Sequence, residues 1–116
     1  MNDMLKRAVD ALTRVDGVRA AMVVDAEAGV PVASQVATGV QETALAAMSG
    51  ALFTRTAYAM STAGYGRVDV VQLEAEGGHV VMAGAGPLLV VALTEPDAGV
   101  GLVRVQTRRA ARELTG

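Results

Sequence analysis

The chain has 116 residues, enough for one domain with a single hydrophobic core, and it contains no Cys and one His, His79. This composition excludes disulfides and Cys/His metal sites, and it is compatible with a reducing cytoplasm, where we expect the protein to act. The formal net charge is −2 and aromatic residues make up 3% of the chain, which argues against general nucleic-acid binding through phosphate contacts or base stacking.

Apolar runs are short throughout the chain. Charged side chains interrupt the first 15 residues, which argues against an apolar signal segment. The longest apolar run, Leu88–Leu93, has the length of a strand and is far shorter than the roughly 18 residues of a membrane span. We therefore predict a soluble protein that does not insert into membranes.

The first elements are a helix and a strand hairpin. Leu5, Ala8, Val9 and Leu12 recur at helical spacing, and the turn chemistry of Asp16-Gly17 ends this first helix. The β-branched segments Val18–Asp25 and Val30–Gln35 then predict two strands joined by a turn. Pro31 cannot donate to a strand ladder, which indicates an edge strand or an irregular start.

The middle segment predicts a long helix that is apolar all round. Thr38-x-x-Gln41 is a capping-box pattern, and no Pro interrupts the residues up to about Thr62. One face of this helix carries Ala44, Leu45, Met48, Ala51, Leu52 and Ala59, and the opposite face carries Ala46, Ala47, Gly50, Phe53, Ala57 and Tyr58. A helix with two apolar faces must be covered on both sides, and a small domain has one sheet to offer. The small residues Ala46, Ala47, Gly50 and Thr54 would let a second backbone approach, so we expect oligomerisation through this helix.

Three strands and a final helix follow. Residues 67–76 alternate partly between polar and apolar, Gly77-Gly78 is a hairpin-turn signal, and His79–Ala83 and Leu88–Thr94 are further strands. The continuous apolar run in the last strand predicts a central position. Val100–Leu114 is a terminal helix. The predicted order is helix, strand, strand, helix, three strands and helix, an α/β (α+β sandwich) domain that spans residues 1–116.

No set of residues has the pattern of an enzyme or cofactor site. Gly99-x-Gly101 precedes a helix as in dinucleotide-binding turns, but Arg104 stands where a third small residue belongs, so a flexible helix start is the better interpretation. His79 has no evident catalytic partner and is interpreted as a solvent-facing hairpin residue. Glu74 and Glu76 are interpreted as a solvated strand edge. We expect no enzymatic activity, no cofactor and no metal.

Basic residues gather near the end of the chain. Residues 20–103 hold two Arg against eight acidic residues, a net charge of −6, whereas residues 104–116 hold four Arg against Glu113. Arg104, Arg108 and Arg112 recur every four residues and form one stripe on the terminal helix. A solvated helix face is the favoured interpretation, and a contact stripe for an acidic partner or an anionic surface is the alternative.

Several segments together resemble the roadblock/dynein light chain family. The segments, in order, are Leu12-x-x-Val15-x-Gly17-Val18-x-Ala20-Ala21-Met22-Val23-Val24-Asp25, Gly29-Val30-Pro31-Val32-Ala33-Ser34, Glu42-x-x-Leu45, Gly64-Tyr65-Gly66, Leu88-Leu89-Val90-Val91-Ala92 and Gly99-x-Gly101-Leu102-Val103-Arg104. The resemblance spans nearly the whole chain. It implies a five-stranded antiparallel sheet, with the two terminal helices on one face and the long middle helix on the other.

The resemblance also implies a function. Family members typically dimerise by pairing the middle helix and the third strand, here residues 40–62 and 67–76, into a ten-stranded sheet, and bacterial members often regulate Ras-like GTPases. We therefore expect a non-catalytic homodimeric regulator or scaffold for a Ras-like small GTPase; the alternative is a docking module for a sensor kinase or motor-type complex without a GTPase role. The expected interface residues are Ala46, Ala47, Gly50, Phe53, Thr54, Ala57, Tyr58, Val68, Val70 and Gln72. Arg55 is interpreted as a cation near the helix end rather than an arginine finger.

Overall fold

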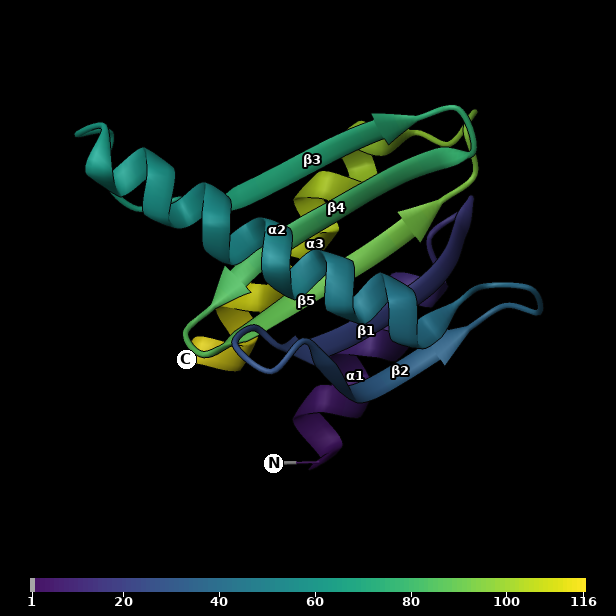
Figure 1. Ribbon diagram of the computed structural model, residues 1–116. Coiled ribbons are helices and arrows are strands. Elements are labelled where there is room, and N and C mark those ends of the chain that lie inside the picture. Colours follow the sequence, from purple (N-terminus) through teal and green to yellow (C-terminus); the bar gives the residue numbers. More distant parts are fainter. Residues whose placement is uncertain (1) are drawn as a thin grey trace.

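The protein is a five-stranded antiparallel sheet covered by helices on both faces, as predicted (Figure 1). The computed structural model describes residues 2–116, with side chains from residue 3 onward. The elements are α1 (Asn2–Thr13), β1 (Val18–Asp25), β2 (Val30–Val36), α2 (Glu42–Thr62), β3 (Val70–Ala75), β4 (Gly78–Ala85), β5 (Leu88–Thr94) and α3 (Val100–Thr115).

The strands follow the order β2-β1-β5-β4-β3 across the sheet, and every neighbouring pair is antiparallel. The apolar strand β5 lies in the centre, where it pairs with β1 on one side and with β4 on the other. Its residues 89–92 are buried, which confirms the central position predicted from the continuous apolar run.

Two separate cores lie on the two faces of the sheet. Helices α1 and α3 pack side by side on one face, where residues such as Leu12, Val90 and Ala110 form a buried cluster. Helix α2 crosses the other face and packs Ala46 and Phe53 against the sheet (Figure 1). Alternate residues of each strand feed the two cores, which gives the predicted layered arrangement.

The two edges of the sheet differ. Strand β2 is an edge strand, and the register of its pairing with β1 shifts where Val24 lies opposite Pro31. This confirms the edge position and the irregularity that Pro31 predicted, because proline has no N–H to donate to the ladder. Strand β3 forms the opposite edge and pairs in regular register with β4.

Three local predictions are corrected by the structure. Helix α2 begins at Glu42 rather than near residue 40, and no side chain caps it, because Gly39 has a φ of +91° and turns the chain before the helix starts. Strand β3 begins at Val70, three residues later than predicted. His79 is buried rather than solvent-facing: its Nε2 donates to the carbonyl of Pro96 at 3.2 Å, since the loop after β5 folds over the β3–β4 hairpin.

Candidate interaction site

The inward face of α2 is defined by small residues that lie close to the sheet. Its buried residues are Ala46, Ser49, Gly50 and Phe53. A Cβ atom at Gly50 would lie 2.9 Å from the carbonyl oxygen of Ala26, in the turn between β1 and β2. Gly50 therefore allows the helix to touch the chain's own backbone, which a larger residue would prevent.

This geometry corrects the assignment of the two faces of α2. Ala46, Gly50 and Phe53 were expected to meet a second chain, yet they are buried against the protein's own sheet, and Ala57 packs at the margin of the same cluster. The face expected to meet a second chain is thus the one that packs on the chain's own sheet. Periodicity did not distinguish the two faces, because both are apolar.

The remaining expected interface residues of α2 are exposed. Ala47 lies beside Gly29 of the β1–β2 turn, and the Thr54 hydroxyl donates to the Ala26 carbonyl at 3.4 Å. Tyr58 is 74% exposed, in the last turns of α2, which extend past the sheet (Figure 1). These three side chains are therefore available for contact, but two of them border the chain's own turn.

The flank of α2 that faces the centre of the sheet is open. Leu45 and Leu52 are half-buried and Met48 is 40% exposed. An open hollow of about 380 Å³ lies between this flank and the sheet, and its lining includes Met48, Leu45 and Leu93 of β5. We call Leu45, Met48 and Leu52 the α2 flank. The sequence places these residues on the face of the helix opposite the expected dimer contacts.

The strands beside the α2 flank are incompletely covered as well. Helix α2 packs mainly on β2 and β1, and it leaves the ends of β5, β4 and β3 uncovered on this face (Figure 1). Val71 and Leu73 of β3 and Leu93 of β5 belong to the margin of the apolar cluster and remain half-buried. The α2 flank and these strands together form an apolar surface that remains partly exposed.

The expected β3 residues take separate positions. Gln72 is exposed and its Oε1 accepts a hydrogen bond from Arg104 Nη1 at 3.0 Å. Val70 is half-buried against the clusters beneath α1 and α3. Val68 precedes the strand and packs at the margin of the cluster beneath α2. The predicted β3 residues therefore lie on both faces of the sheet: Gln72 and Val70 on the α3 side, and Val68 on the α2 side.

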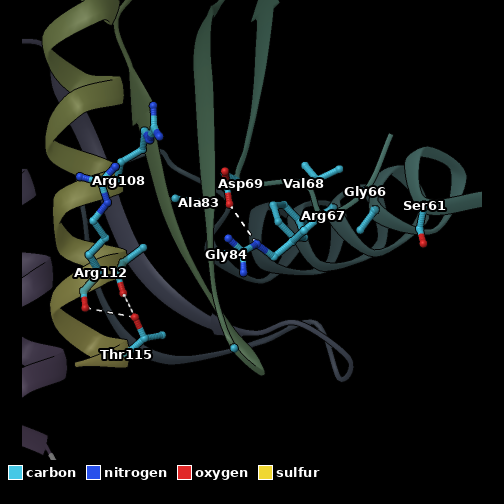
Figure 2. A pocket seen from close by; sticks show the side chains of 14 residues that line it. Ser61, Gly66, Arg67, Val68, Asp69, Ala83, Gly84, Arg108, Arg112 and Thr115 are labelled. Atoms are coloured by element: carbon cyan, nitrogen blue, oxygen red, sulfur yellow. Dashed lines mark hydrogen bonds and ion pairs between the residues drawn. The ribbon is translucent and has the colours of Figure 1, made fainter. Parts of the chain in front are cut away.

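Arg104, Arg108 and Arg112 lie on the side of α3 that faces the β3 edge of the sheet. Arg108 and Arg112 border a second hollow of about 560 Å³, which opens where β4 continues past the start of β3. Figure 2 shows both arginines on one wall and Arg67 opposite them, where Arg67 contacts Asp69 at 3.3 Å. All three arginines of the stripe are exposed.

Arg55 is not placed near the end of its helix. Helix α2 continues to Thr62, and its last turn contains no basic residue. The helix dipole acts within the last turn, so it does not explain Arg55, and that interpretation is wrong. Arg55 is exposed on the outer side of α2, and none of the three ion pairs found in residues 2–116 includes it.

The segment Gly99-x-Gly101 starts α3, as predicted. Gly99 is the N-cap residue, and its carbonyl accepts hydrogen bonds from the N–H groups of Leu102 and Val103. Among the described residues, no group of three or more His, Cys, Asp or Glu side chains is arranged to hold a metal ion. Within residues 2–116, no helix has both the length and the apolar character that crossing a bilayer requires.

The orientation of α2 gives a first testable prediction. Phe53→Leu is expected to lower the free energy of unfolding by about 1–2 kcal/mol, because it removes part of a buried ring that packs beside Gly84 and leaves a cavity. Urea denaturation at a fixed protein concentration measures this. Tyr65→Leu, at an exposed aromatic just beyond α2, is the control and is expected to change stability by less than about 0.5 kcal/mol. Equal effects of the two changes would contradict the orientation.

Comparison with known proteins identifies the family. A model of the Roadblock/LC7 domain matches residues 4–93 of the chain. The chain belongs to the Roadblock/LC7 family. A relative from Methanocaldococcus jannaschii is 32% identical over 98% of this chain and 96% of its own length, and a second from the same organism is 30% identical over 96% of both. Both are uncharacterised proteins.

Solved Roadblock/LC7 structures share the fold. The gliding protein MglB from Thermus thermophilus superimposes with a TM-score of 0.83 at 20% identity, covering 97% of this chain and 87% of that one. A Roadblock/LC7 domain from Streptomyces avermitilis gives a TM-score of 0.82 at 17% identity, covering 95% and 93%. The fold class and the family expected from the sequence are thus confirmed.

Proposed function

We propose that this Roadblock/LC7 protein is a non-catalytic homodimer that acts in the cytoplasm as a regulator or scaffold of a Ras-like small GTPase. The observation that carries the proposal is the apolar surface formed by the α2 flank and the uncovered strands, beside the open β3 edge. A surface of this kind on a small protein marks a site of association.

A second copy of the chain fits this surface. Pairing two β3 edges about a two-fold axis would extend the sheet and bring the α2 helix of each copy towards the uncovered strands of the other. Val71, Leu73 and Leu93 would then lose their contact with water, as would Met48. Burial of apolar side chains supplies the free energy of such an association.

The GTPase role is supported by family membership and by the shape that pairing would create. Two α2 helices side by side would present one broad surface, with Arg55 exposed on it from each copy. Such a surface can hold a GTPase by shape and charge without supplying a catalytic group. Arg55 is the only basic residue of α2 and would supply the positive charge of this surface.

Binding to a Ras-like GTPase encoded near this protein tests the proposal. Purified GTPase loaded with GDP or with a non-hydrolysable GTP analogue would be titrated by calorimetry, with the oligomeric state of this protein determined in parallel by sedimentation. Binding that differs between the two nucleotide states is the expected result. A dimer that binds in neither state would contradict the GTPase role and favour the docking module for a sensor kinase or motor-type complex.

A further inference from the structure

The β3 edge has an unpaired backbone whose direction follows from its contact with β4. The carbonyl of Asp69 accepts a hydrogen bond from Gly84 N at 3.1 Å, so residue 69 faces β4. In an antiparallel ladder the direction alternates along the strand, so residues 71, 73 and 75 also face β4. Val70, Gln72 and Glu74 therefore direct their N–H and C=O groups away from the sheet, where a further strand would bind.

One register of pairing satisfies these groups completely. If Gln72 lies opposite Gln72 of a second copy, then Val70 lies opposite Glu74 of that copy and Glu74 opposite its Val70. All three outward-facing residues of each strand then exchange hydrogen bonds with one another. A two-fold axis placed at Val71 or at Leu73 instead leaves one of the three without a partner inside the strand. The register centred on Gln72 is thus favoured by the backbone alone.

The same three residues project their side chains towards α3. Arg104 on α3 donates to Gln72, and Val70 packs into the cluster beneath that helix. Four residues of helix rise about 6 Å and two residues of strand rise about 6.6 Å, so the two spacings nearly coincide. Arg104 lies beside residue 72, so these spacings are expected to place Arg108 near residue 70 and Arg112 beyond it. Both arginines line the hollow that the segment before β3 also borders (Figure 2).

Acidic residues of a second copy would occupy those positions. In the register centred on Gln72, Glu74 of the second copy lies opposite residue 70, and Glu76, in the turn that follows β3, would lie beyond it towards the segment that precedes β3. None of the three ion pairs in residues 2–116 uses Arg108, Arg112, Glu74 or Glu76, and all four are exposed. Asp69, the acidic residue that lines this hollow, already contacts Arg67.

We propose that Arg108 and Arg112 of each protomer bind Glu74 and Glu76 of a second copy, and that these ion pairs set the register of β3 pairing. The inference rests on the homodimer of the proposed function. The Arg-lined hollow is then a half-site that the second copy completes. A two-fold axis gives four such pairs, so their combined effect exceeds that of an isolated surface pair.

Charge reversal in two complementary variants tests this proposal. Variant one carries Arg108→Glu and Arg112→Glu, and variant two carries Glu74→Arg and Glu76→Arg. In the homodimer of either variant, side chains of the same charge would then face each other across the interface. We expect the dissociation constant of each homodimer to rise at least about tenfold. In a mixture of the two variants every pair is again of opposite sign, so we expect a heterodimer with an affinity close to that of the wild-type homodimer.

A control variant makes the same change of charge at a different part of the surface. Arg7→Glu with Arg109→Glu makes the same charge change as variant one at exposed sites of α1 and α3 outside the stripe, and it is expected to leave dissociation unchanged. Variants that dimerise as tightly as the wild type, or a mixture no tighter than either variant alone, would overturn the ion pairs. A wild-type protein that is monomeric at high micromolar concentration would instead overturn the homodimer itself.

The absence of Cys from the sequence allows an independent test of register. Directly opposed residues in a hydrogen-bonded antiparallel pair have Cα atoms about 5.5 Å apart, which suits a disulfide. Gln72→Cys is therefore expected to cross-link the dimer under mild oxidation faster than Val71→Cys or Leu73→Cys. Faster cross-linking of either of these two variants would place the two-fold axis elsewhere and overturn the proposed register.

Discussion

Replacing Met48 with Glu is expected to convert the proposed dimer into monomers while leaving the fold intact. Met48 lies in the middle of the α2 flank and is 40% exposed, so a single chain accommodates the carboxylate in water. In the dimer we propose, the same carboxylate would be buried without a partner, which costs about 3–5 kcal/mol. The dissociation constant is expected to rise more than a hundredfold, as measured by sedimentation velocity over a dilution series.

The chain offers a matched control for this change. Met4 on α1 is 39% exposed, almost the same fraction as Met48, but it lies on the opposite face of the sheet. Met4→Glu is expected to leave the sedimentation coefficient and the binding of a GTPase unchanged. If both variants remained dimeric, the α2 flank would not be the contact surface, and the apolar strands beside it would need another explanation.

Replacing Gly78 with Ala is expected to lower the free energy of unfolding by about 3 kcal/mol or more. Gly78 begins β4 with a φ of +148°, which side chains of L-residues rarely adopt, and a Cβ atom there would overlap the carbonyl oxygen of Thr94. The obstructing atom belongs to the backbone at the end of β5, so no rotamer change relieves the contact. Chemical denaturation at a fixed protomer concentration measures the loss.

Gly77 provides the control for this second change. It immediately precedes Gly78, has no positive φ and has open space where a Cβ atom would lie. Gly77→Ala is therefore expected to change stability by less than about 0.5 kcal/mol. A similar loss for both variants would show that the flexibility of the hairpin, rather than the close approach of β4 to Thr94, accounts for the two glycines.

The fold was predictable because its signals act locally and agree with one another. Continuous apolar residues in β5 indicate a strand covered on both faces, and the Gly77-Gly78 pair marks the β3–β4 hairpin. Pro31 correctly indicated an irregular edge strand. Where prediction failed locally, at the start of α2 and at His79, the cause was a turn or a loop whose path depends on contacts remote in sequence.

The orientation of α2 was not predictable for a physical reason. Its two faces have similar apolar character, so their burial gains similar free energy, and the choice depends on how closely each approaches the sheet. Gly50 was the available signal, since it marks a close backbone contact. The sequence does not tell whether that contact lies within the chain or between chains. Similarly, the spacing of Arg104, Arg108 and Arg112 predicted a stripe on one side of the last helix. It did not predict that this stripe lies beside β3.

The irregular edge formed by β2 limits how far the protein can associate. Pro31 offers no N–H group, and the pairing of β2 with β1 is offset beside it, so a regular ladder is not continued there. When two copies join through β3, the strands left at the two ends of the combined sheet are both β2. Further growth by strand pairing is then disfavoured at both ends, so we expect a rise in concentration to give more dimers instead of fibres.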